Sequence, residues 1–172
     1  VETRRVPDWT GRLAAHVADL LRGDGADAPS LERIEADIEA GSIADSHWKN
    51  AMSRPLSPPE LTYEQFWGDF VAADWPKPAR DAVLREAREL CRVMGEMRSH
   101  RQLRSGLIPL LDACDSKHVP VGIVSNALCG QVHLDFLAEQ GLTDRFAVKI
   151  HSDEVRVRKP NPEMIFIACR AL

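Results

Sequence analysis

The sequence lacks the features that mark most secreted, membrane and nucleic-acid-binding proteins. Its 172 residues include only four cysteines, which lie far apart with no C-x-x-C pair, so neither a zinc site nor a disulfide framework is indicated. No apolar run approaches the roughly 18 residues of a membrane span, and the N-terminal residues show no signal-peptide core. The net charge of −4 gives no electrostatic reason to expect nucleic acid or an anionic membrane as a partner. We therefore expect a cytoplasmic protein with reduced thiols.

The composition that remains is that of an ordinary globular protein. Hydrophobic residues make up 44% of the chain and charged residues 28%, which is enough to build and solubilise a core. The six histidines form no H-x-x-H or H-E-x-x-H pair, so they are interpreted as surface or core side chains and not as metal ligands.

The first hundred or so residues have the patterns of helices. Helices are predicted at residues 9–21, at residues 31–40 with Gly41 as the stop, and from Thr62 to about residue 73. A longer amphipathic helix is predicted after the Trp75-Pro76 break. We expect the four tryptophans to pack the core of this helical region, with one of them a candidate for a pocket wall.

From about Ser105 the pattern changes to alternating helices and strands. Residues 119–125 and 147–151 are predicted to be parallel strands joined by a crossover helix at residues 130–140. A helix at residues 106–117 leads into the first strand, and Pro162 stands in the first turn of a closing helix. Two parallel strands are too few to stand alone, so the outer edge of strand 119–125 is expected to be bare or paired with residues outside this chain.

Three polar residues stand out in this second region. Ser125 and Asn126 end the apolar strand, at the edge of a parallel sheet where ligands bind. The helix that follows can offer backbone N–H groups to an anion. Lys159 lies 34 residues after Ser125, and the prolines at 160 and 162 fix the backbone beside it. Arg156 and Arg158 are interpreted as solvated surface residues, and Asp153 and Glu154 as loop acids outside the site.

The segments VGIVSNA and RKPNP around these residues resemble motifs II and III of the haloacid dehalogenase-like (HAD) hydrolases, which are mostly phosphatases. The resemblance implies that Ser125 binds a phosphoryl oxygen, with Asn126 beside it as a further substrate-binding residue. It implies that Lys159 offsets the repulsion between an attacking aspartate and a phosphate dianion. The implied substrate is a small phosphorylated metabolite, a phosphate monoester, and the implied cofactor is Mg²⁺.

The resemblance also implies a division of the chain and a fold class. Residues 1–103 correspond to a helical cap with an N-terminal stub of the core, and residues 104–172 to a partial core. The expected fold is α/β, a partial Rossmann-like HAD core with an all-helical cap. The nucleophilic Asp-x-Asp and the second acidic pair that binds Mg²⁺ in the family are not found, so we expect an internal piece of a longer enzyme that is inactive by itself.

Two other functions remain open at this stage. A 2-haloacid dehalogenase, in which an aspartate displaces halide from carbon without a metal, uses a similar Ser-Asn pair and lysine. A non-catalytic binding module would keep the fold and lose the aspartates. Ser125 and Lys159 suit all three functions, so motifs II and III do not separate them.

Overall fold

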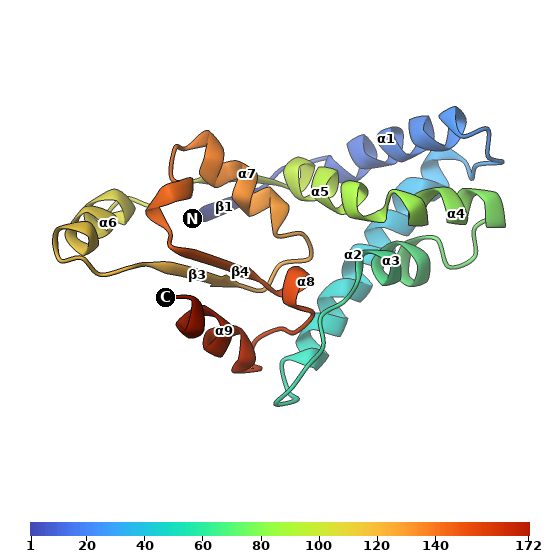
Figure 1. The fold of residues 1–172 in the computed structure, drawn as a ribbon. Helices are drawn as coiled ribbons and strands as arrows, with labels where there is room; N and C mark the ends of the chain where they lie inside the picture. The colour runs from blue at the N-terminus through green and yellow to red at the C-terminus, as the bar shows by residue number, and fades with distance from the viewer.

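Helices α1 and α2 form an antiparallel pair that starts the helical half of the molecule. In the computed structural model, which describes residues 1–172, they are α1 (Trp9–Gly23) and α2 (Leu31–Met52) (Figure 1). Ser30 begins α2 as predicted, because its side chain accepts a hydrogen bond from the Arg33 N–H. No helix has the length and hydrophobicity needed to cross a membrane.

Gly41 does not end α2, and the prediction of a stop there was wrong. The helix continues to Met52. A Cβ atom at Gly41 would lie 2.6 Å from Cγ2 of Val71 and 3.1 Å from the Phe70 carbonyl oxygen. Glycine is therefore needed for close approach of two helices, and the packing offsets its low helix propensity.

The rest of the helical half follows the predicted order with two local changes. The Thr62 and Gln65 capping box opens α3 (Tyr63–Gln65), but the chain then winds into a π-helical segment, η1 (Phe66–Val71). The predicted long amphipathic helix is two helices, α4 (Lys77–Arg85) and α5 (Ala87–Arg98). The largest fully buried side chains of this half, all below 2% exposed, are Leu13, Val17, Leu21, Ile34, Ile38, Phe66, Trp67, Val83 and Leu90.

A short antiparallel ribbon, which the sequence did not predict, joins the two ends of the helical half. Strand β1 (Glu2–Arg5) pairs with β2 (Ser99–Gln102), so the chain enters and leaves the helices side by side. Both strands are short and polar, and they lack the alternating apolar residues that mark a half-buried strand. The domain boundary that the sequence predicts at residue 103 would fall directly after β2.

The α/β half contains the predicted parallel strand pair. Strand β3 (Gly122–Ser125), which is shorter than expected, pairs with β4 (Val148–His151). Along the outer edge of β3 no strand of residues 1–172 is paired, as expected. Helices α7 and α9 lie on opposite sides of the strand pair (Figure 1). The remaining elements of this half are α6 (Leu107–Ser116), α7 (Gln131–Glu139), η2 (Thr143–Arg145), α8 (Ser152–Val155) and α9 (Glu163–Ala171).

Candidate active site

Ser125 is the last residue of β3 and lies opposite His151, the last residue of β4. The carboxyl ends of both strands therefore meet at one edge, which is where α/β sheets bind ligands. The Ser125 side chain is partly buried, and its Oγ has only a long contact of 3.4 Å with the Asn126 carbonyl oxygen. At that distance the hydroxyl makes a weak bond at best, so it can turn to another acceptor.

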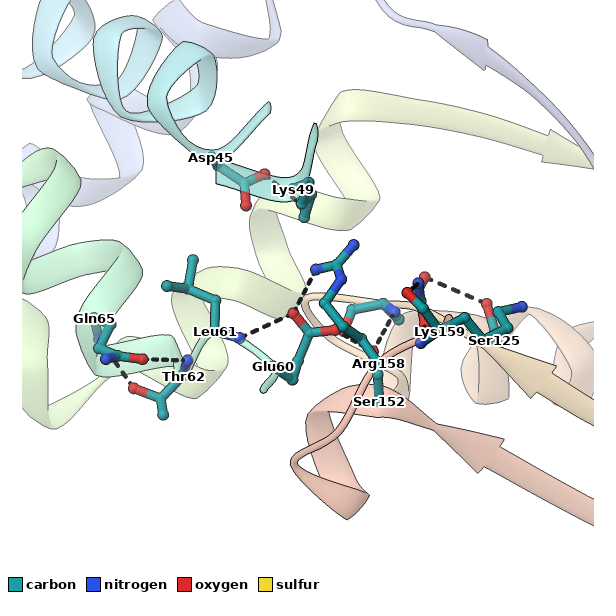
Figure 2. Close-up of polar contacts among 12 residues, drawn as sticks. Asp45, Lys49, Glu60, Leu61, Thr62, Gln65, Ser125, Ser152, Arg158 and Lys159 are labelled. Carbon is teal, nitrogen blue, oxygen red and sulfur yellow. Dashed lines mark hydrogen bonds and ion pairs between the residues drawn. The ribbon is translucent and has the colours of Figure 1, made fainter. Parts of the chain in front are cut away.

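Lys159 is fixed to the end of β3 by three hydrogen bonds. The Asn126 side-chain amide receives a hydrogen bond from the Lys159 backbone N–H at 2.8 Å and donates one to the Lys159 carbonyl oxygen at 3.1 Å. The Lys159 ammonium donates to the Val124 carbonyl oxygen at 2.8 Å. Figure 2 shows Lys159 beside Ser125. The structure thus brings together the three site residues that the sequence predicted, Ser125, Asn126 and Lys159.

The start of α7 is used differently from the prediction. The Gly130 N–H donates to the Asp153 carboxylate at 2.9 Å, and the Ala127 N–H donates to Ser152 Oγ at 2.9 Å. These two backbone donors are therefore occupied within the protein and are not free for an anion. Asp153 is only 3% exposed and also accepts a hydrogen bond from the Tyr63 hydroxyl at 2.6 Å. Asp153 is therefore a buried cap of α7. The sequence interpretation of Asp153 as a loop acid did not predict this role.

Arg158, next to Lys159, is buried, and its interpretation as a surface residue was wrong. Its side chain is 8% exposed, and Nη1 donates to Glu60 Oε1 at 2.7 Å. The same Glu60 oxygen accepts the Leu61 N–H at 2.9 Å, and the other oxygen accepts a short hydrogen bond from Ser152 Oγ. Figure 2 shows Glu60 between these donors. We call Glu60, Arg158 and Ser152 the Glu60 network.

The backbone reinforces this connection between the two halves. The Glu60 N–H donates to the Arg156 carbonyl oxygen at 3.2 Å, and the Arg158 N–H donates to the Pro58 carbonyl oxygen at 3.3 Å. A proline-rich loop of the helical half thus lies along the segment that leads into Lys159, with a bridge between Pro59 and Val157. The position of Lys159 therefore depends on contacts from both halves.

Two stacked histidines lie behind the site and are neutral at physiological pH. The rings of His133 and His151 are 5.7 Å apart and nearly parallel. Burial, with help from Arg101 and from His151, lowers the pKa of His133 to about 4. Burial also lowers the pKa of His151. A Cβ atom at Gly130 would lie 2.5 Å from the Cβ of His151, so glycine is required where the start of α7 meets the end of β4.

The residues present do not form a site for Mg²⁺. Nowhere in residues 1–172 do three His, Cys, Asp or Glu side chains gather as a metal-binding group. Both oxygens of the buried Glu60 carboxylate accept hydrogen bonds from Arg158, Leu61 and Ser152, and Asp153 uses one oxygen for Tyr63 and the Gly130 N–H, which leaves its Oδ1 as a single unpaired oxygen. The chain therefore presents a hydroxyl and an ammonium at this edge without a ligand set for a metal ion.

Comparison with known proteins agrees with this geometry. The comparison with individually curated proteins gave no match. A family model for hydrolases, described as haloacid dehalogenase-like hydrolase, matches residues 14–172, which is nearly the whole chain and both of its halves. The match includes the Ser-Asn end of β3, the Lys159 segment and the helical half, so the chain belongs to the haloacid dehalogenase-like hydrolases.

Proposed function

We propose that the protein is a cytoplasmic phosphatase of a small phosphate monoester, and that residues 1–172 supply its cap and its phosphoryl-holding residues. The observation that supports this most is the double hydrogen bond between Asn126 and the Lys159 backbone. It holds a cation beside a serine hydroxyl at the carboxyl edge of parallel strands. A fixed positive charge there stabilises the charge of a transferring phosphoryl group.

Each of the three residues has a separate task in this proposal. Ser125 Oγ donates a hydrogen bond to a phosphoryl oxygen, for which its long contact with Asn126 leaves it free. The Lys159 ammonium leaves the Val124 carbonyl oxygen and pairs with the phosphate dianion. Both ends of the Asn126 amide are used on Lys159, so we assign Asn126 to positioning the lysine.

The nucleophile in this proposal is an aspartate contributed from outside residues 1–172. In-line attack on phosphorus would form an aspartyl-phosphate and release the alcohol, and water would then cleave the acyl phosphate to regenerate the carboxylate. We expect residues 1–172 alone to be inactive. Mg²⁺ is proposed for the whole enzyme on the basis of the family resemblance, and no step is assigned to it because this chain has no ligand set for it.

A parallel assay of phosphate release and halide release tests the function. The full-length protein would be incubated with 4-nitrophenyl phosphate and with 2-chloropropionate, each with and without EDTA. Phosphate release that EDTA abolishes is the expected result. Chloride release that survives EDTA would replace the proposal by a dehalogenase. Binding of phosphate without turnover of either substrate would replace it by a binding module.

A further inference from the structure

A cleft of about 310 Å³ lies between the two halves, next to the candidate site. From the helical half it is lined by α2, α5 and the β1–β2 ribbon, with Arg101 on β2, and from the α/β half by residues 127–129 and the first turn of α7. Residues 127–129 directly follow Ser125 and Asn126, so the cleft opens beside the end of β3. Its volume is at the lower end of those of small-molecule sites, which start at about 300 Å³.

The cleft is positively charged in a protein with a net charge of −4. Its thirteen lining residues include Lys49, Arg98 and Arg101 and no aspartate or glutamate. The other ionisable groups there are neutral at physiological pH: burial lowers the pKa of His133 to about 4 and raises the pKa of the Cys129 thiol. The charge of the wall is therefore set by the three cations.

Two of these cations have no carboxylate partner. Lys49 is paired with Asp45 at 2.6 Å, whereas neither Arg98 nor Arg101 forms a salt bridge. The Arg98 guanidinium lies over the Trp9 ring at 5.4 Å. Arg101 donates to the carbonyl oxygens of Gly95 and Ser99, and its Nε is buried without a partner. Burial lowers the pKa of both arginines, with Arg5 adding to the effect at Arg98.

A structural role accounts for only part of this arrangement. Arg101 stabilises the end of α5 through its bond to Gly95, because a cation there interacts favourably with the helix dipole. That contact uses one nitrogen and requires no second guanidinium. A neighbouring pocket that Arg101 also lines contains Glu96, Asp135 and Glu139, so acidic residues are available nearby and yet none faces the cleft. Both guanidinium groups are half-buried and neither has a salt-bridge partner, and a partly desolvated charge is costly unless a ligand supplies the counter-ion.

We propose that this cleft binds a second anionic group of the substrate, a carboxylate or a second phosphate, through Arg98 and Arg101. The inference rests on the proposed phosphatase function, because it places the ester phosphate at Ser125 and Lys159 and the second anion in the adjoining cleft. Guanidinium groups bind both kinds of anion, since each presents a planar set of donors to carboxylate or phosphate oxygens. The substrate class is thus a small phosphate ester that carries a second anionic group.

Steady-state kinetics on three esters of the full-length protein test this proposal. The probes are phosphoglycolate, which carries a carboxylate, 1,3-propanediol bisphosphate, which carries a second phosphate, and ethyl phosphate, which carries neither. The variants are Arg101→Gln and Arg98→Gln, with Lys49→Gln as a third cleft variant in case an arginine variant does not fold. Arg104→Gln is the matched control, because Arg104 is exposed and forms no side-chain bond.

The expected result is at least a tenfold rise in KM for one or both of the probes that carry a second anionic group in the cleft variants, and less than a twofold change for ethyl phosphate. Whichever charged probe has the lower KM in the wild-type protein identifies the source of the anion. Equal effects on all three esters, or no effect on any of them, would overturn the proposal while leaving the phosphatase intact.

Equilibrium binding of phosphonoacetate, which has two anionic groups and is not hydrolysed, distinguishes failure of the anion site from failure of the phosphatase proposal. If no ester is turned over but phosphonoacetate binds and Arg101→Gln weakens it at least tenfold, the anion site stands and the phosphatase proposal falls. If phosphonoacetate binds wild type and Arg101→Gln equally, the anion site falls regardless of turnover.

Discussion

The helical half and the α/β half are stabilised in different ways. The helical half contributes most of a continuous cluster of 23 buried hydrophobic residues, whereas the α/β half has a separate cluster of only four, Leu111, Leu137, Leu142 and Phe146. In the α/β half the buried residues include Ser152, Asp153 and Arg158, each with hydrogen-bond partners in the helical half. Apolar packing thus stabilises the helical half, and hydrogen bonds to the helical half position the functional residues of the α/β half.

This difference matters for function because polar contacts are directional. A hydrogen bond of 2.7 Å from the Arg158 side chain to Glu60 and one of 2.8 Å from the Lys159 backbone N–H to Asn126 fix the segment at Lys159. Through the Glu60 network the helical half therefore supports the segment that carries the lysine.

The largest effects on stability are expected from cavities in the helical core. Leu13→Ala should lower the free energy of unfolding by about 3 to 5 kcal/mol, and Leu111→Ala by about 2 to 3 kcal/mol, because Leu111 has fewer buried apolar neighbours to lose. The two leucines are 0% and 1% exposed, so burial itself does not distinguish them. Urea denaturation of both variants measures the difference, with Leu56→Ala, 84% exposed, as the control. A larger loss for Leu111→Ala would contradict the comparison.

Disrupting the Glu60 network should lower the free energy of unfolding almost as much as Leu13→Ala does. Glu60→Gln leaves the buried Arg158 charge without its counter-ion, and we expect a loss of about 3 kcal/mol. Adding Arg158→Met should restore part of this loss, because the unpaired charge is then removed. Glu64→Gln, at an exposed position in the same segment, is the matched control. Equal losses for Glu60→Gln and Glu64→Gln in urea denaturation would show that the network contributes nothing.

The sequence predicted the parts of this arrangement that depend on local pattern. Ser125 and Asn126 could be found because they end an apolar strand, and Lys159 because it directly precedes Pro160 and Pro162. Glu60 could not, since its partner Arg158 is 98 residues away and nothing near either residue marks it as buried. The same reason explains the error at Gly41, where contact with Val71 decides the outcome and local helix signals do not.

Removing the Asn126 side chain should affect turnover more than affinity. Asn126→Ala deletes two hydrogen bonds to the Lys159 backbone, worth about 1 kcal/mol each, so we expect kcat to fall about thirtyfold. KM should change less than threefold, since the ammonium itself remains. Asn50→Ala, at an exposed helix position, is the control for the full-length enzyme. A selective rise in KM would instead assign Asn126 to direct substrate binding.

The pH dependence of stability should show the buried histidines as a smaller effect. His133 has a pKa of about 4 in the folded protein, below its ordinary value of 6.5, so between these values protons bind the unfolded chain preferentially. Its contribution is present above pH 6.5 and is lost as pH falls towards 4, by about 1 kcal/mol after allowance for partial exposure. His133→Gln should make the free energy of unfolding depend less on pH across this range. His100→Gln, at an exposed position, should leave the dependence unchanged. An unchanged slope in His133→Gln would refute the assignment.

Turnover of Lys159→Ala in the full-length protein tests the central claim most directly. With 4-nitrophenyl phosphate and Mg²⁺, kcat should fall about 10²-fold, the scale seen when a fixed charge stabiliser is removed. Ser125→Ala should lower kcat by less, and Lys117→Ala, at an exposed turn, should leave kcat unchanged. Unchanged turnover in Lys159→Ala would contradict the claim that the end of β3 and the Lys159 segment form the phosphoryl site.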